Sequence, residues 1–221
     1  MTSARFFGLF TLVALTLTAC NTSITFGQDV DAVGDLVTVP FEVEPFDSIA
    51  VSNTFEAFVE IGEPRSVEII VNESVVDELD IRVRNGELKI GLKNGISINN
   101  GTLEANIRIP ALAAIDVSGA SSTDISGVDA RSLDIDLSGA SDLVVSGTAT
   151  TVRIDGSGAS TIDVRLESIE SAIIDLSGAS SLELQAADMI SGDMSGASSL
   201  IAPTEAQLNL DTSGASSISR R

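Results

Sequence analysis

The sequence lacks histidine, tryptophan and tyrosine, and it has one cysteine among 221 residues. Without imidazole there is no histidine base, no Ser-His-Asp relay and no histidine-ligated metal, which excludes the commonest catalytic and transition-metal sites. A single cysteine cannot form an intrachain disulfide or a thiolate zinc cluster. The missing Trp and Tyr also argue against aromatic platforms for sugars or bases. These absences indicate a chain with little catalytic chemistry, and no cofactor is predicted.

Basic residues are scarce as well. The chain has 12 Lys and Arg against 32 Asp and Glu, a formal net charge of −20. This charge repels the phosphates of nucleic acids, so no nucleic-acid partner is expected. Hydrophobic residues nevertheless make up 43% of the chain, which is enough to build a core and argues against disorder.

The first twenty residues are typical of an export signal. Arg5 precedes an uninterrupted apolar and small-residue stretch over residues 6–19, and Cys20 follows directly. A transmembrane helix needs ~20 apolar residues, so this stretch is too short to span a bilayer. The sequence LTAC that ends at Cys20 resembles the bacterial lipobox, in which the thiol is acylated before cleavage. We predict a signal peptide over residues 1–19 and lipidation of Cys20; the alternative is an ordinary signal peptide with a coincidental cysteine.

Lipidation predicts the location of the exported protein. More than one acyl chain is needed for stable attachment, and such chains hold a protein on a membrane that it does not span. By resemblance to enterobacterial sorting rules, Asn21 in place of an aspartate favours the outer membrane or the cell surface. Residues 20–39 are polar and rich in small side chains, which predicts a tether after the lipidated cysteine whose later half can already be strand.

Residues 40–110 are predicted to form an N-terminal β-rich segment. Short runs in this region alternate apolar and polar residues, and this period of two predicts strands with one buried face; the clearest runs are 48–51, 55–61 and 67–71. Asn85-Gly86 separates two further runs and tolerates the positive φ angles of a two-residue hairpin turn. Residues 72–79 predict one short helix with Asn72 as its N-cap.

Residues 111–221 repeat the motif D-x-S-G-A-S six times. The serines that open the motif are separated by 20, 19, 20, 18 and 18 residues, which is the period of stacked solenoid turns and too short for propeller blades. The glycine permits a tight corner, while alanine and serine keep the corner thin enough for identical neighbours to stack. The fold prediction is all-β: a single-stranded parallel β-helix of about six turns of 18–20 residues, capped by the N-terminal β-rich segment.

Side-chain parity predicts the interior of this stack. The residue before the opening serine and those two and four positions earlier share one face, as in Leu133, Ile135 and Leu137. The predicted inward positions resume after the motif at Thr123, Leu143, Ile162, Leu182, Leu200 and Ile218. The motif aspartate falls on the opposite, outer face.

Stacking of the turns predicts an outer column of six aspartates, which we call the Asp column: Asp116, Asp136, Asp155, Asp175, Asp193 and Asp211. At the inter-strand spacing of ~4.8 Å, neighbouring carboxylates repel by about 0.9 kcal/mol in bulk water. One interpretation is turn capping, in which each carboxylate accepts a hydrogen bond from the amide two residues on. A less favoured one is a row of shared Ca²⁺ ions, although one carboxylate per turn supplies few ligands. Catalysis is least favoured, because paired acid and base carboxylates need unlike environments.

The sequence resembles the head GIN domain of the putative autotransporter adhesin family. Three features carry the resemblance: the recurring SGAS motif, the opening stretch Phe41–Ile49 and the N-G-x-L hairpin at Asn85–Leu88. It covers roughly residues 41–219 and implies a right-handed parallel β-helix in the bacterial envelope. Many relatives have an acidic residue or glycine after SGA where this chain has serine, so no binding residue is carried over from the family.

The predicted function is a non-catalytic cell-envelope lipoprotein that presents an acidic β-helix for adhesion or ligand binding. Its expected partners are the membrane, through the lipid anchor, and an unknown envelope protein or glycan. The alternative is a structural or sensory envelope protein that binds another envelope protein or self-associates through the open end near Arg220 and Arg221. A carbohydrate-active enzyme comes last.

Overall fold

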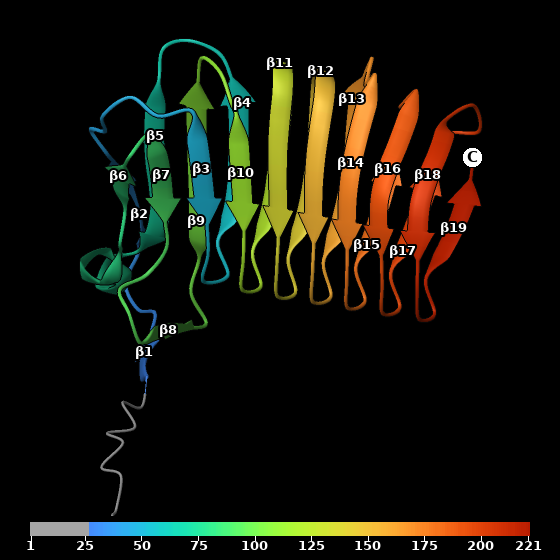
Figure 1. Ribbon diagram of the computed structural model, residues 1–221. Helices are drawn as coiled ribbons and strands as arrows, with labels where there is room; N and C mark the ends of the chain where they lie inside the picture. Colours follow the sequence, from blue (N-terminus) through green and yellow to red (C-terminus); the bar gives the residue numbers. More distant parts are fainter. Residues whose placement is uncertain (1–26) are drawn as a thin grey trace, which may run out of the picture.

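The computed structural model describes residues 27–221, so the predicted signal peptide and Cys20 lie outside the described residues. The described chain is all-β, as predicted. Seventeen strands belong to one large sheet and two strands form a separate small sheet. In residues 27–221 the one helical element is a 3-10 helix over Glu73–Glu78. The large sheet runs the length of the molecule, with the N-terminal strands at one end and the repeats extending away from them (Figure 1).

The N-terminal part of the large sheet mixes parallel and antiparallel pairing. β5 pairs antiparallel with β2 and β9, whereas β4 pairs parallel with β9 and β3 pairs parallel with β7. These strands are β2 (Leu36–Pro40), β3 (Ser48–Val51), β4 (Glu56–Ile61), β5 (Ser66–Asn72), β6 (Arg82–Arg84), β7 (Glu87–Ile90) and β9 (Leu103–Ile109). The strands predicted over 48–51, 55–61 and 67–71 are therefore present.

The described part of the predicted tether contains strands. β1 (Gln28–Asp31) pairs in parallel with β8 (Ile96–Asn99) as the separate two-stranded sheet, and β2 ends at Pro40. The Leu36 to Pro40 stretch alternates half-buried and exposed residues, which suits the edge of a half-buried sheet. Strands were expected only in the later half of residues 20–39, but the first strand already begins at Gln28.

The predicted hairpin is confirmed. β6 and β7 pair antiparallel on either side of Asn85-Gly86, and these two residues have φ angles of 54° and 83°. Asn and Gly are the residues that best tolerate this left-handed conformation.

The helix predicted over 72–79 is a 3-10 helix, and its predicted side-chain cap is wrong. Asn72 occupies the N-cap position but makes no side-chain capping hydrogen bond. Its amide Nδ2 instead donates to the carbonyl of Gly34, and its Oδ1 accepts a hydrogen bond from the amide of Thr102. The side chain joins two distant segments, a use that local capping rules do not anticipate.

The repeats supply the rest of the large sheet. The bounds of their strands are β10 (Ala114–Val117), β11 (Ser122–Leu137), β12 (Asp142–Gly156), β13 (Thr161–Glu167), β14 (Ser171–Leu176), β15 (Ser181–Leu184), β16 (Met189–Met194), β17 (Ser199–Ala202), β18 (Gln207–Thr212) and β19 (Ser217–Arg220). Each of them except β18 and β19 pairs in parallel with the equivalent strand one repeat later, so that Ile135 lies beside Ile154 and Ile154 beside Ile174. The SGAS residues form the loops that join the strands at one edge (Figure 1).

The predicted inward positions form the core. Leu133, Ile135 and Leu137 are buried, as are their equivalents in the following repeat. The last repeat differs, because Leu208 and Leu210 are half-buried and Ile218 is 39% exposed. In the described chain β18 pairs only with β16 and β19 only with β17, so nothing covers the outer side of this repeat.

A column of glycines forms the corners. Gly139 and Gly158 have φ angles of 76° and 73°, in the region that L-residues with a Cβ avoid. The stacking is close: a Cβ built on Gly158 would lie 2.3 Å from the carbonyl oxygen of Gly139. That same oxygen accepts a hydrogen bond of 2.7 Å from the amide of Ala159. Glycine is needed both for the turn and for the approach of the next repeat.

We expect Gly158→Ala to lower the free energy of unfolding by about 2 kcal/mol or more, because it adds left-handed strain and a backbone collision. Ala159→Ser is the matched control, since Ala159 is exposed one position further along the same corner. Chemical denaturation of both variants measures the difference. A loss below about 0.5 kcal/mol for Gly158→Ala would contradict the corner geometry.

Candidate functional site

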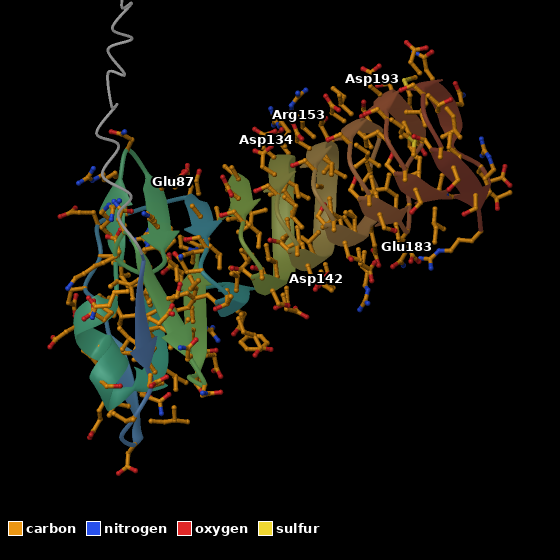
Figure 2. The ribbon with its side chains drawn as sticks, turned by 90° about the horizontal axis from the view of Figure 1, so that it is seen from below. Glu87, Asp134, Asp142, Arg153, Glu183 and Asp193 are labelled. Carbon is orange, nitrogen blue, oxygen red and sulfur yellow. The ribbon has the colours of Figure 1, made fainter. Side chains whose placement is uncertain are left out.

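The Asp column is the most regular charged feature of the described chain. The strand register pairs each of its members directly with the next, from Asp116 on β10 to Asp211 on β18. Asp155 is half-buried and the other five are exposed. Asp193 lies on the same side of the stack as Asp134 and Arg153, whereas Asp142 and Glu183 lie on the other side (Figure 2). The six carboxylates therefore share one outer face.

In the N-terminal strands, the positions in register with the Asp column are not acidic. Ala50 on β3 pairs with Asp116, and Lys89 on β7 pairs with Ala50. The ammonium of Lys89 is 3.1 Å from the carboxylate of Asp80, so an ion pair already engages this cation. The Asp column is therefore bounded at this end by a neutral position and a paired lysine.

Asp116 and Asp136 are exposed as whole residues, but their carboxylates lose part of their water to neighbouring atoms. This partial burial raises the pKa of Asp116, and the charges of Asp136 and Glu87 raise it further. Burial also raises the pKa of Asp136, with added repulsion from Asp155 and Asp134, while Arg153 acts in the opposite direction. Both shifts mean that the ionised carboxylate is less favourable in the folded protein than in water. At the start of the Asp column, the fold therefore holds neighbouring carboxylates close together in spite of their mutual repulsion.

The turn-capping role predicted for these aspartates is not what the described residues show. The amide two residues after each aspartate donates to a carbonyl of the preceding strand instead: Ser138 to Val117 at 3.0 Å and Ser157 to Leu137 at 2.9 Å, for example. The same holds in all six copies. Because the sheet ladder already uses these amides, the carboxylates are left to face solvent.

Serine caps the corners in place of aspartate. The hydroxyl of the second motif serine donates to the carbonyl of the first in four copies, at 2.8 to 2.9 Å. Of all six second serines, five are almost fully buried: Ser121, Ser141, Ser160, Ser180 and Ser198. From the sequence, these serines were expected only to keep the corner thin, and their capping role was not predicted. Their signal was the invariant serine three positions after the opening one, the spacing of a local side-chain-to-backbone bond.

The described residues provide no ready metal site. Among residues 27–221, no group of three or more Asp, Glu or Cys side chains is arranged to hold a metal ion. Calcium usually takes 6–8 oxygen ligands, and neighbouring column members come one from each strand. Calcium binding along the column stays a hypothesis without geometric support.

The lipidation site and the export signal lie outside the described residues. Cys20 and residues 1–19 remain predictions from the sequence. Within residues 27–221, no helix has the length and apolar character needed to cross a bilayer.

Comparisons with known proteins identify relatives of this fold. The model of a family described as "Putative auto-transporter adhesin, head GIN domain" matches residues 45–203. A search of curated proteins gives no match. Among solved structures, a putative adhesin from Bacteroides fragilis has 16% identity and a TM-score of 0.70, covering 87% of this chain and 100% of its own.

Two solved structures from Parabacteroides distasonis are also similar. A putative adhesin has 18% identity and a TM-score of 0.57, covering 88% of this chain and 100% of its own. A putative lipid binding protein has 13% identity and a TM-score of 0.52, with the same coverage. Identities this low show a common fold and nothing about a shared ligand.

The raised pKa values of Asp116 and Asp136 predict that the protein loses stability as these carboxyl groups ionise. An aspartate with a raised folded-state pKa keeps its proton more tightly when folded, so the free energy of unfolding falls as pH rises from the ordinary value of 3.8 through the folded value. We expect Asp136→Asn to raise the free energy of unfolding by about 1 kcal/mol near neutral pH, since two column neighbours no longer repel it. The gain should vanish at about pH 3, where the aspartate is protonated in both states. Denaturant titrations at both pH values measure it.

Asp142→Asn is the control for this prediction, because Asp142 is exposed and its register partners are Ser122 and Thr161. An equal gain from this variant would contradict the column repulsion. The same titrations in millimolar calcium and in EDTA test shared cations: stabilisation by calcium in the wild type but not in Asp136→Asn would support a calcium row.

Proposed function

Because the chain belongs to the head GIN domain family of putative auto-transporter adhesins, we propose that it is a non-catalytic cell-envelope lipoprotein that presents an acidic β-solenoid for adhesion or ligand binding. The family description and the related solved structures refer to adhesins and not to enzymes. An adhesin works at a surface, which fits a protein of the bacterial envelope.

The proposed architecture is a right-handed, single-stranded parallel β-helix of about six turns over residues 111–221, with residues 40–110 as the N-terminal cap. Its support is the register, in which equivalent residues 18 to 20 positions apart pair in parallel repeat after repeat. Further support is the corner bond that the alanine amide of repeats two to six makes to the glycine carbonyl of the repeat before it. Such stacks are stiff, since each turn contacts its neighbours along its whole length.

The observation that carries the proposed function is the unbroken Asp column on one outer face. The strands hold six carboxylates in register from β10 to β18. A fixed row of like charges complements a partner with cationic groups, attracts that partner over a distance and selects its orientation. The chain's net charge of −20 strengthens the same attraction.

The proposed anchor is the acylated thiol of Cys20 after removal of residues 1–19. The first described strand begins at Gln28, so the spacer between anchor and sheet would be short. This arrangement would keep the cap close to the outer membrane or cell surface and direct the repeats away from the cap (Figure 1).

A second candidate is a structural or sensory envelope protein that self-associates or binds another envelope protein. The observation that favours it is the last repeat, where the outer edges of β18 and β19 carry no strand partner in the described chain and Ile218 is 39% exposed. Sheet edges of this kind pair readily with another chain. A carbohydrate-active enzyme has the least support, because the column repeats one environment and offers no unlike pair of carboxylates.

Substitution of the predicted anchor tests the lipoprotein assignment. We expect Cys20→Ser to move the protein from the membrane fraction to the soluble or uncleaved precursor fraction and to abolish the acyl mass on the mature N-terminus, because no thiol remains to be acylated. Fractionation and mass spectrometry of the full chain measure both effects. Thr22→Ser should leave both unchanged; a mature wild-type N-terminus without the acyl mass would exclude the lipid anchor.

The adhesive role is tested by capture. Immobilised full-length protein is exposed to envelope extract and to a glycan array, in parallel with the double variant Asp175→Asn/Asp193→Asn. We expect the double variant to bind the captured partner about fivefold less tightly, since two exposed charge pairs contribute about 1 kcal/mol together. The matched control is Asp142→Asn/Asp188→Asn, which removes two exposed acids outside the Asp column.

Equal losses from both double variants would show that the Asp column is not the binding surface. If the captured component is the chain itself and sedimentation shows oligomers at high concentration, the self-associating alternative holds. Capture of no component by the wild type, with a monomer in sedimentation, would overturn both.

A further inference from the structure

A groove lies on the outer side of the molecule that is opposite to the Asp column. Its larger part, of about 340 Å³, lies over β4, β5, β9 and β11. A second hollow of about 240 Å³ adjoins it over residues 40–43 and shares Ser66 and Glu68 with it. Asp124, which lines the groove, shows on which side it lies. Asp124 pairs with Val144, and Val144 faces the same way as Asp142, two residues earlier in the same strand. Asp142 lies on the side of the molecule away from Asp134 and Asp193 (Figure 2).

Phe58 lines the larger hollow. It pairs with Asn106 on β9 and with Asp124 on β11, and it is 41% exposed whereas Phe46 and Phe55 are at most 5% exposed. Of the four phenylalanines in residues 27–221, Phe58 is the exposed one; Phe41 is half-buried. An exposed aromatic in a concave surface is the common mark of a binding site.

The charge around this ring is unbalanced. Arg108 donates to Glu60 at 2.5 Å, which neutralises its charge, whereas Arg65 lies over the ring of Phe46 at 5.6 Å and makes no ion pair. The two hollows together are lined by four acids and two basic residues, so acidic charge remains in excess. The remaining acids make no ion pair within residues 27–221; they are Glu42, Glu68 and Asp124. Arg165 is close enough to feel the charge of Asp124, but its guanidinium bonds Asp163. An aromatic face beside carboxylates in excess of their cations is the arrangement that binds a guanidinium or ammonium group.

We propose that this groove binds an extended, arginine-bearing segment of a partner protein, with a guanidinium over the ring of Phe58 and beside the carboxylate of Asp124. The second hollow takes the continuation of the segment, and Glu68, which lines both hollows, receives a further cationic side chain. The joined hollows favour an extended chain over a compact small molecule. The site uses neither the Asp column nor the lipid anchor, so it does not rest on the function proposed above.

A peptide fits these observations better than a neutral glycan. A neutral sugar would leave the excess carboxylate charge uncompensated, while an arginine neutralises it and uses the phenylalanine face at the same time. The bidentate geometry of the guanidinium also suits a carboxylate beside a flat ring.

The test uses the purified full-length protein and a fluorescein-labelled peptide of sequence Gly-Ser-Arg-Gly-Arg-Ser-Gly, with binding followed by fluorescence anisotropy. The control peptide has citrulline, the neutral isostere, in place of each arginine. We expect the arginine peptide to bind at least tenfold more tightly, and added salt to weaken it. Phe58→Leu should lower its affinity about fivefold and Asp124→Asn about threefold.

Asp142→Asn is the matched control, since it removes an exposed acid from the same face outside the groove, and the Asp175→Asn/Asp193→Asn variant reports on the Asp column. Both should bind the peptide as the wild type does. Equal binding of the two peptides, or wild-type affinity in both groove variants at an unchanged melting midpoint, would overturn the proposal. A loss confined to the column variant would overturn it too, and binding of a neutral glycan that Phe58→Leu abolishes would replace it with a sugar site.

Discussion

The corner hydrogen bond between consecutive repeats is the interaction on which the rest of the structure depends. From the second repeat to the sixth, each motif alanine amide donates to the glycine carbonyl one repeat earlier, at 2.7 to 2.8 Å. This bond forms only because the glycine adopts a positive φ and lacks a Cβ, which lets two backbones come together. It sets the repeats in register at one edge, and the parallel strands continue that register on both sides of the corner.

The register in turn determines which side chains meet. Inward positions stack as columns of branched aliphatic residues, such as Ile135, Ile154 and Ile174, and fill the interior without aromatic side chains. The same register brings the aspartates together on the outside, where they repel one another. The fold tolerates this because burial of the aliphatic columns and the continuous ladder far outweigh a repulsion of about 1 kcal/mol per pair.

The periodic features could be predicted from the sequence because they follow from local rules. The all-β class, the inward columns and the Asn85-Gly86 hairpin depend on a period of two or on a turn pair. The capping roles were wrong where a distant partner competed: the ladder takes the amide near each aspartate, and Gly34 and Thr102 take the side chain of Asn72. Local propensity carries no information about such partners.

The groove around Phe58 could not be predicted from the sequence for the same reason. Its ring, Asn106 and Asp124 come from three strands that are far apart in the chain, and only the pairing of β4 with β9 and β11 places them side by side. The exposure of Ile218 in the last repeat likewise depends on which strands are paired on both sides. By contrast, the buried serine column could have been predicted, since the hydroxyl bonds within its own motif.

The Asp column has a further consequence as a line of fixed charge. Parallel strands space its carboxylates at ~4.8 Å, a charge density within a factor of about three of that of duplex DNA, with one charge per ~1.7 Å. Such a line gathers small cations from solution into a diffuse sheath. A multivalent partner that displaces this sheath would gain entropy from the released ions, so its association would depend on the ionic strength of the surroundings more than on any single contact.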